Sequence, residues 1–269
     1  TMGRHILIIA LSILVTGSFG SFNTPASAAT TKPLPASGKV ELMLGADGEM
    51  PTTIYVPEGT GIKPLILVIH ASGGMMDADH DYAKALRKEG YISVVPDFFT
   101  SYDITQKTKT ETWTDYRDDI HKDFTTIISQ VKSMSKIPSK NVFAVGFSNG
   151  GYWAAALAAR GDIDAGVSYY GAYSEGGTVR GRSAIESASI ISEADSDSAP
   201  LLMFHGTDDS FVPFEVAKIF EDLYPNVEAH YYDDVEHIYE RKGKFDYYDE
   251  EAAKDSWGKT LKFLKQHRK

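Results

Sequence analysis

Apolar positions along the chain fall into alternating runs and continuous runs. Val40–Leu44 and Thr52–Val56 alternate apolar with polar side chains around a short turn at 46–48, which is typical of an antiparallel β-hairpin. Leu65–His70 is continuously apolar, as expected of a strand that is buried on both faces. Further strands are predicted at Tyr91–Pro96, Asn141–Phe147, Gly166–Tyr170, Leu201–His205 and Glu228–Asp233.

Helical patterns lie between these strands and after the last one. They are predicted at Tyr82–Lys88, Asp115–Met134, from Asn149 onward, near Pro213–Leu223 and at Ala252–Gln266. Strands that alternate with helices favour an α/β fold: a mostly parallel central sheet with helices on both faces, extended here by the N-terminal antiparallel hairpin. With no internal repeat, residues 39–269 are predicted to form a single domain.

Two polar stretches interrupt the alternation. Residues 99–114 and 173–199 are too long for ordinary connections within a compact domain. Long loops at the carboxyl ends of parallel strands often build ligand sites, so each stretch is either a lid over a site or a surface insertion.

The first residues have the pattern of a secretory signal peptide. Arg4 and His5 precede the apolar run Ile6–Val15, and Ala26-Ser27-Ala28 forms an A-x-A cleavage site. The alternative is an uncleaved anchor, but the run is shorter than the roughly 20 residues that span a bilayer. We therefore expect a signal peptide over residues 1–28, a flexible mature N-terminus over 29–38, no stable membrane anchor after cleavage, and a secreted or periplasmic location.

Composition narrows the function. The formal net charge of −10 argues against nucleic acid as a partner, because binding phosphates in quantity requires an excess of Lys and Arg. The chain has no cysteine, which excludes both disulfides and a thiol nucleophile.

A glycine-flanked serine follows the strand that ends at Phe147. Gly146-Phe147-Ser148-Asn149-Gly150 matches G-x-S-x-G between a predicted strand and a predicted helix. In that setting a strained turn pushes the serine hydroxyl out of the sheet, and the helix N-terminus favours a developing oxyanion. Ser148 is therefore the candidate nucleophile; the alternative is a helix N-cap with glycines for packing.

A serine nucleophile needs a base and an acid that orients it. His237 follows a strand in a loop, downstream of the serine and of an acidic loop, and is the candidate general base. Asp208 and Asp209 compete for the orienting role; Asp209 is favoured because it lies further beyond the strand end. Glu236 is interpreted as a solvated charge.

Backbone donors for an oxyanion hole are expected at Asn149 and in the loop after Leu65–His70, at Ser72 or alternatively Gly73. Aromatic residues near strand ends are candidates for substrate binding, although many such residues belong to a core. These candidates are Phe147, Phe211, Trp113 and Tyr152.

Acidic residues before a predicted helix raise the question of a metal. Asp77, Asp79, His80 and Asp81 cluster there, but such a cluster more often caps the helix and stabilises its dipole. We predict no metal site and no cofactor.

Several stretches of the chain carry a resemblance to known proteins: VIHASGG, YISVVPDFF, VFAVGFSNGGYWAAALAA, SYYGAY, LLMFHGTDDSFVP and the His237 loop. Together they resemble the α/β-hydrolase superfamily and, within it, the dienelactone hydrolase family. The resemblance spans Leu65–His237 and implies an α/β-hydrolase fold, with Ser148 as nucleophile, Asp209 as acid and His237 as base. The family usually carries a cysteine nucleophile and is commonly cytoplasmic, whereas this chain has a serine and an export signal.

The sequence therefore predicts an exported serine hydrolase that cleaves carboxylic esters, either small or polymer-derived, or lactones. Two alternatives stay open. One is a serine peptidase related to the oligopeptidases, although no propeller or other gating domain precedes the catalytic residues. The other is a non-catalytic binding protein on the same fold.

Overall fold

The computed structural model describes residues 32–61, 63–135, 141–173, 194–243 and 245–269. Three predicted segments lie wholly or partly outside the described residues. They are the expected signal peptide, the first residues of the expected flexible N-terminus, and positions 174–193 of the second long stretch. Within residues 32–38, the Leu34 amide donates a hydrogen bond to the carbonyl of Met134, so this part of the segment lies against the domain.

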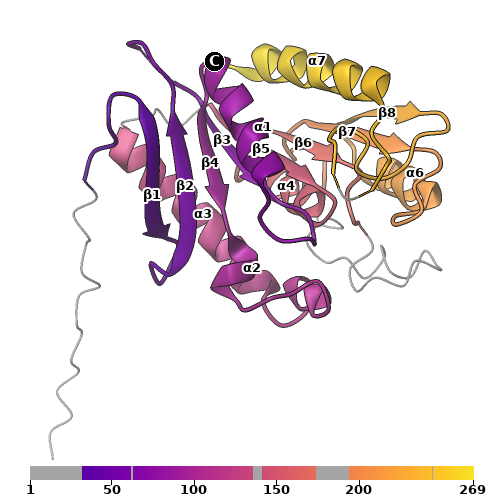
Figure 1. The fold of residues 1–269 in the computed structure, drawn as a ribbon, viewed down its shortest axis with the longest axis horizontal. Helices are drawn as coiled ribbons and strands as arrows, with labels where there is room; N and C mark the ends of the chain where they lie inside the picture. The colour runs from indigo at the N-terminus through magenta and orange to yellow at the C-terminus, as the bar shows by residue number, and fades with distance from the viewer. Residues whose placement is uncertain (1–31, 62, 136–140, 174–193, 244) are drawn as a thin grey trace, which may run out of the picture. The chain divides into compact units, whose positions relative to one another are not determined.

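Eight strands form one sheet in the order β1-β2-β4-β3-β5-β6-β7-β8 (Figure 1). β1 pairs antiparallel with β2 and β2 pairs antiparallel with β4, whereas all pairs from β4 to β8 are parallel. The predicted mostly parallel sheet with an antiparallel N-terminal hairpin is confirmed. The strands are β1 Gly38–Leu44, β2 Met50–Val56, β3 Leu65–Ile69, β4 Ile92–Pro96, β5 Val142–Phe147, β6 Ala165–Tyr169, β7 Leu201–Gly206 and β8 Val227–Tyr232.

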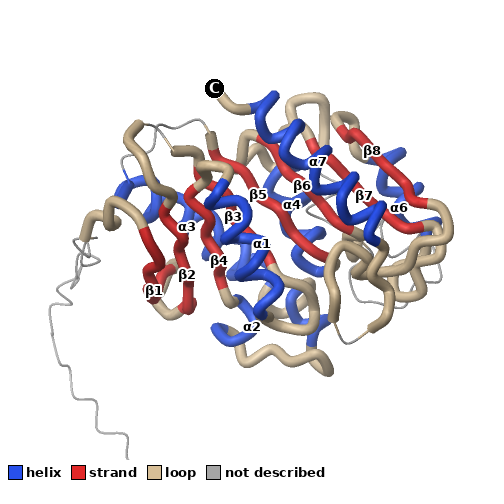
Figure 2. The backbone as a smooth tube through the Cα atoms, turned by 45° about the horizontal axis from the view of Figure 1, so that its top comes forward, coloured by secondary structure: helices blue, strands red, loops and turns tan. Residues whose placement is uncertain are grey.

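Helices cover both faces of the sheet (Figure 2). One apolar core joins the sheet to α3, α4 and α6, and a second core joins its other face to α1 and α7. β3 divides its side chains between the two cores, with Leu67 in the first and Val68 in the second, because successive side chains of a strand point to opposite faces. The helices are α1 Asp77–Lys88, α2 Phe98–Ser101, the short 3₁₀ helix η1 Lys109–Thr112, α3 Arg117–Ser135, α4 Asn149–Ala159, α6 Phe214–Leu223 and α7 Glu250–His267.

Apart from shifts of one or two residues at element ends, the structure differs from the predicted elements in two places. α1 begins at Asp77 rather than Tyr82, because the Asp79 carboxylate accepts the Met76 amide and so satisfies a donor at the helix start. The stretch 99–114 also contains regular structure: α2 begins just before it, where the Asp97 side chain accepts the Thr100 amide, and η1 lies within it.

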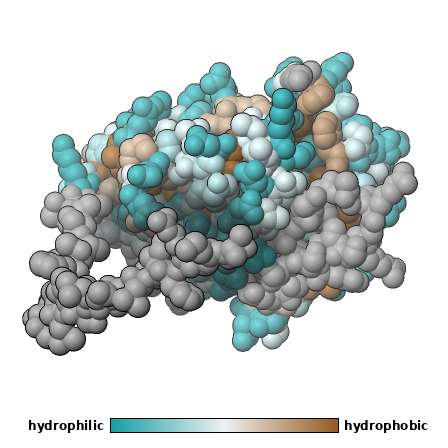
Figure 3. All heavy atoms as spheres, turned by 90° about the horizontal axis from the view of Figure 1, so that it is seen from below, coloured by the Kyte–Doolittle hydropathy of each residue, from teal (hydrophilic) through white to brown (hydrophobic). Residues whose placement is uncertain are grey.

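On the face drawn in Figure 3, hydrophilic, intermediate and hydrophobic residues are interspersed. Within the part of the chain that the structure describes, no helix is long and apolar enough to cross a membrane.

Glycines at the β5–α4 turn permit contacts that no side chain could. A Cβ on Gly146 would lie 1.8 Å from the Gly150 carbonyl oxygen, and a Cβ on Gly150 would lie 2.0 Å from the Ile69 carbonyl oxygen. α4 therefore begins pressed against the ends of β5 and β3, which fixes the residue between these glycines, Ser148, at the edge of the sheet.

Replacing Gly150 by alanine should destabilise the domain, because overpacking a rigid contact costs about 1–3 kcal/mol. Gly258 offers the matched control, since it is an exposed position in α7 where an added Cβ meets nothing within 4 Å. Gly258→Ala should stabilise by about 0.5–1 kcal/mol through helix propensity and a less flexible unfolded chain. Urea unfolding of both variants measures the difference; equal effects would mean that the turn relaxes freely.

Candidate active site

Ser148 lies in a strained turn between β5 and α4. Its backbone has φ 52° and ψ −108°, a left-handed conformation that is uncommon for a residue other than glycine. The turn is held by hydrogen bonds from the Ser148 amide to the Tyr169 carbonyl and from the Ala172 amide to the Ser148 carbonyl, at 3.0 and 2.9 Å. The strained turn is thus held by β6 and the loop that follows it, and Ser148 lines a cavity.

Asp209 and His237 meet at the carboxyl ends of β7 and β8. The Asp209 Oδ2 atom lies 2.6 Å from His237 Nδ1, and both residues are buried. The other carboxylate oxygen, Oδ1, accepts the amides of Phe211 and Val212 at 2.9 and 2.7 Å. These three contacts fix the carboxylate in place, and the Nδ1 contact leaves Nε2 of the imidazole available for chemistry. Asp208, by contrast, is exposed.

The loops that carry these two residues are joined by a glycine and a glutamate. A Cβ on Gly206 would lie 2.0 Å from the Val235 carbonyl oxygen, so the loops touch through backbone. Glu236 Oε2 accepts hydrogen bonds from the Ser210 amide, the Ser210 hydroxyl and the His237 amide at 3.0–3.1 Å. Glu236 is half-buried, and its carboxylate, interpreted from the sequence as a solvated charge, also bridges the two loops.

His205 is buried beside Asp209 and contacts the loop that carries it. Its Nε2 lies 2.8 Å from the Val212 carbonyl and 3.4 Å from Asp209 Oδ2, and its ring is fully buried. Burial lowers the pKa of His205 below its ordinary value, against the smaller opposing effect of Asp209. A neutral imidazole therefore donates to the Val212 carbonyl and keeps the acidic loop turned toward His237.

The loop after β3 lines the same cavity as Ser148. Ser72 and Gly73 are the central residues of a turn closed by a 3.0 Å hydrogen bond from the Gly74 amide to the Ala71 carbonyl, and both line the cavity. Asn149 Nδ2 donates to Ser72 Oγ at 3.3 Å and ties this turn to α4. The Asn149 amide belongs to the first turn of α4, where amides have no acceptor within the helix. The structure thus brings Asn149 and Ser72, two of the residues predicted to supply donors, into side-chain contact.

His70, just before this turn, shapes the loop. Its Nδ1 lies 2.8 Å from the Ala71 carbonyl, and its ring stacks on Phe98 at a centroid distance of 4.2 Å. Burial lowers the pKa of His70, so the ring is neutral.

A cavity of about 300 Å³ brings the predicted residues together. Ser148 and His237 line it, as do the predicted substrate-binding residues Trp113 and Phe211. The structure does not bring Phe147 and Tyr152 to it: both are fully buried, and neither is among the described residues that line the cavity. Phe147 packs in one core and Tyr152 in the other, because the strand and helix periodicities turn them away from the site.

Cationic side chains in this cavity were missed from the sequence. Arg241, Lys109 and Lys242 line it, and no Asp or Glu does among the described residues. Arg241 is held by Asp79 and Glu240, and its guanidinium lies 4.1 Å from the centre of the Phe147 ring. The charge of Arg241 is thus balanced by two carboxylates outside the cavity lining, and Lys109 and Lys242 are the other cationic residues that line the cavity. The only feature of the sequence that pointed to Arg241 is its position four residues after His237.

Two residues that line the cavity each carry a buried donor without a hydrogen-bond partner among the described residues. These donors are Nη2 of Arg241 and Nε1 of Trp113. A buried donor that is left unpaired costs free energy.

The polar side chains at the start of α1 form hydrogen bonds and ion pairs with other residues of the protein. Asp79 accepts the Met76 amide and pairs with Arg241, Asp81 pairs with Lys84, and His80 Nδ1 lies 3.1 Å from the Tyr55 hydroxyl. No group of three potential metal ligands is found among the described residues.

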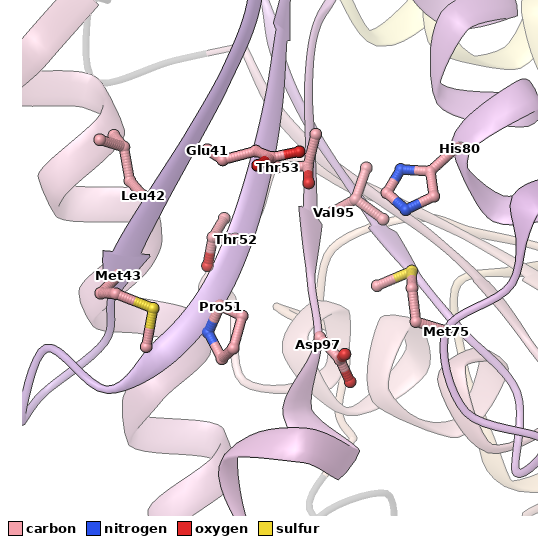
Figure 4. A pocket seen from close by; sticks show the side chains of 10 residues that line it. All are labelled: Glu41, Leu42, Met43, Pro51, Thr52, Thr53, Met75, His80, Val95 and Asp97. Atoms are coloured by element: carbon pink, nitrogen blue, oxygen red, sulfur yellow. The ribbon is translucent and has the colours of Figure 1, made fainter.

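A second cavity, of about 320 Å³, lies beside β1, β2 and β4 (Figure 4). Glu41, His80 and Asp97 supply its charged or titratable side chains, and apolar residues such as Met43 and Val95 supply much of the rest. None of the residues predicted for catalysis lines this cavity, so the cavity at Ser148 is the candidate active site.

The fold defines the class of protein first. The structure is similar to a dienelactone hydrolase-like promiscuous phosphotriesterase from metagenomic libraries, with a TM-score of 0.68 and 18% identity over 86% of this chain and 99% of that one. It is also similar to a thermophilic esterase of the planctomycete Thermogutta terrifontis, with a TM-score of 0.63 and 16% identity over 86% of this chain and 92% of that one. The predicted α/β-hydrolase fold is confirmed.

The sequence defines the family. Residues 50–268 match the dienelactone hydrolase family. A protein of Azospirillum brasilense that is named as a carboxymethylenebutenolidase is 32% identical over 243 residues, which cover 85% of this chain and 98% of that protein. The chain belongs to the dienelactone hydrolase family and is a carboxylic ester hydrolase.

Proposed function

We propose that the protein is an exported serine esterase in which Ser148, His237 and Asp209 form a catalytic triad. The observation that carries the proposal is the strained Ser148 turn in the same cavity as His237, whose Nδ1 lies 2.6 Å from Asp209. Its substrates are small or polymer-derived carboxylic esters, or lactones. A cavity of about 300 Å³ accommodates a small ester or the end of a longer one.

The reaction proceeds in two steps of acyl transfer. Ser148 Oγ attacks the ester carbonyl carbon while His237 Nε2 takes the hydroxyl proton, and Asp209 stabilises the resulting imidazolium. The amides of Asn149 and of Ser72 or Gly73 stabilise the oxyanion. The carbon–oxygen bond to the alcohol then breaks, and His237 returns the proton to the leaving oxygen. Water, deprotonated by His237, adds to the acyl-enzyme, and the carboxylic acid leaves as Ser148 is reprotonated.

Export rests on the N-terminal pattern described above. Cleavage after Ala28 would release a mature chain without an anchor, in the periplasm or the medium. Mass spectrometry of the N-terminal peptide from periplasm and medium tests this step; an intact leader in the membrane fraction would refute it.

Hydrolysis of p-nitrophenyl esters from acetate to decanoate tests the activity against the two alternatives. We expect turnover with an optimum of chain length, because a cavity of about 300 Å³ limits the acyl chain that it can hold, and no turnover of peptide p-nitroanilides. Cleavage of the anilides at comparable rates would favour a peptidase. Binding of esters without turnover, by a folded protein, would favour the non-catalytic alternative.

A further inference from the structure

Exposed apolar side chains concentrate at the mouth of the Ser148 cavity. Among the described residues, the large apolar side chains that are exposed are Met43, Met76, Phe211, Leu223 and Phe245. Three of these five, Met76, Phe211 and Phe245, line this cavity. Large apolar side chains that gather in one exposed place mark a binding surface more often than chance.

The aromatic members form a continuous surface that begins at the imidazole. The Phe211 ring lies 5.2 Å from the His237 ring and 5.5 Å from the Phe245 ring, which it meets nearly edge to face at 66°. Phe245 in turn stacks on Tyr247, with ring centres 5.4 Å apart and planes within 6°. We call Phe211, Phe245 and Tyr247 the aromatic ledge.

We propose that the aromatic ledge binds an aromatic ring in the alcohol part of the ester substrate. This inference rests on the proposed function. In that reaction His237 returns its proton to the leaving alcohol oxygen, so this oxygen must lie within hydrogen-bond reach of Nε2. The substituent on the oxygen then leaves the reaction centre beside the imidazole, where Phe211 begins the ledge. The acyl part is directed elsewhere, because its carbonyl oxygen must face the Asn149 and Ser72 amides.

The ledge distinguishes an aromatic ring from a saturated one. Ring pairs in stacked or edge-to-face geometry gain about 0.5–1.5 kcal/mol beyond the area that they bury. The planes of Phe211 and Phe245 differ by 66°, so a third ring packed against both would meet them in different geometries. Met76 adds a polarisable sulfur that also favours aromatic contacts. A saturated ring of similar volume would gain only the free energy of burying its apolar surface.

Four esters separate the two sides of the substrate. Benzyl acetate and cyclohexylmethyl acetate carry an aromatic or a saturated ring on the alcohol; methyl phenylacetate and methyl cyclohexylacetate carry the same rings on the acyl part. For the mature protein, kcat/KM should be about 2- to 12-fold higher for benzyl acetate than for cyclohexylmethyl acetate, which corresponds to the aromatic gain above. The two methyl esters should differ by less than this.

Phe211→Leu and Phe245→Leu test the ledge directly. Each replaces an exposed ring by an apolar side chain, so folding should be kept, and circular dichroism checks it. Each should bring the benzyl-to-cyclohexylmethyl ratio toward one. Leu223→Ala removes an exposed apolar side chain that does not line the cavity and should leave the ratio unchanged.

The outcomes separate this inference from the proposed function. If the esters are hydrolysed and the wild-type ratio is close to one, or the ratio survives in both Phe variants, the ledge proposal is wrong and the esterase stands. A ring preference on the acyl side alone would also overturn it. If none of the four esters is hydrolysed by the folded protein, the proposed function fails first, and the ledge proposal falls with it.

Discussion

Hydrolysis of p-nitrophenyl acetate by the Ser148→Ala variant should fall by about 10⁴- to 10⁶-fold in kcat, because the substitution removes the hydroxyl that forms the acyl-enzyme. The chain has no cysteine that could replace the hydroxyl. The remaining activity should be that of water in a cavity that still holds the oxyanion donors, since those donors are backbone amides that the substitution leaves in place. Initial rates at saturating substrate, with the protein at high concentration, measure the loss.

Ser129→Ala is the matched control. Ser129 is an exposed serine of α3 that does not line the cavity, and its hydroxyl donates to the Thr125 carbonyl within the helix. Its rate should equal that of the wild type. Equal rates in the Ser148→Ala variant and the wild type would exclude Ser148 as nucleophile and assign the hydrolysis to general-base activation of water or to a contaminant.

Much of the site could be predicted because its determinants are local in sequence. The glycines around Ser148 are required by contacts within the β5–α4 turn and with the neighbouring β3, and they follow a pattern of five residues. The same holds for the positions of Asp209 and His237, each of which comes shortly after a strand. The parallel order of β7 and β8 then brings these two loops together without further information.

Other features depend on contacts between distant residues, and the sequence pattern missed them. Arg241 is buried because it pairs with Asp79, which lies 162 positions earlier. Glu236 connects two loops because the amide and hydroxyl of Ser210, 26 positions earlier, donate hydrogen bonds to its carboxylate. Phe147, by contrast, was predicted to bind substrate but does not line the cavity. The period of the strand places its side chain in the core with Val145.

Asp209→Asn should lower kcat for ester hydrolysis by about 10³- to 10⁴-fold, whereas Asp208→Asn should change it by less than about threefold. Both changes remove one negative charge and keep the side-chain volume, and the two residues are adjacent. They differ in contacts: the Asp209 carboxylate lies 2.6 Å from His237 Nδ1 and accepts two backbone amides, whereas Asp208 is exposed.

The physical reason is the state of the imidazole. An asparagine at 209 can still accept the Phe211 and Val212 amides, but it cannot stabilise the imidazolium that forms when Ser148 loses its proton. Its amide nitrogen would also donate toward Nδ1, which favours the tautomer that carries the proton on Nε2 and so removes the base. The defect should therefore appear mainly in kcat, with KM nearly unchanged, because the cavity lining is intact. A comparable loss in the Asp208→Asn variant, or full activity in Asp209→Asn, would assign the orienting role to another carboxylate, of which Glu236 is the nearest in sequence to His237.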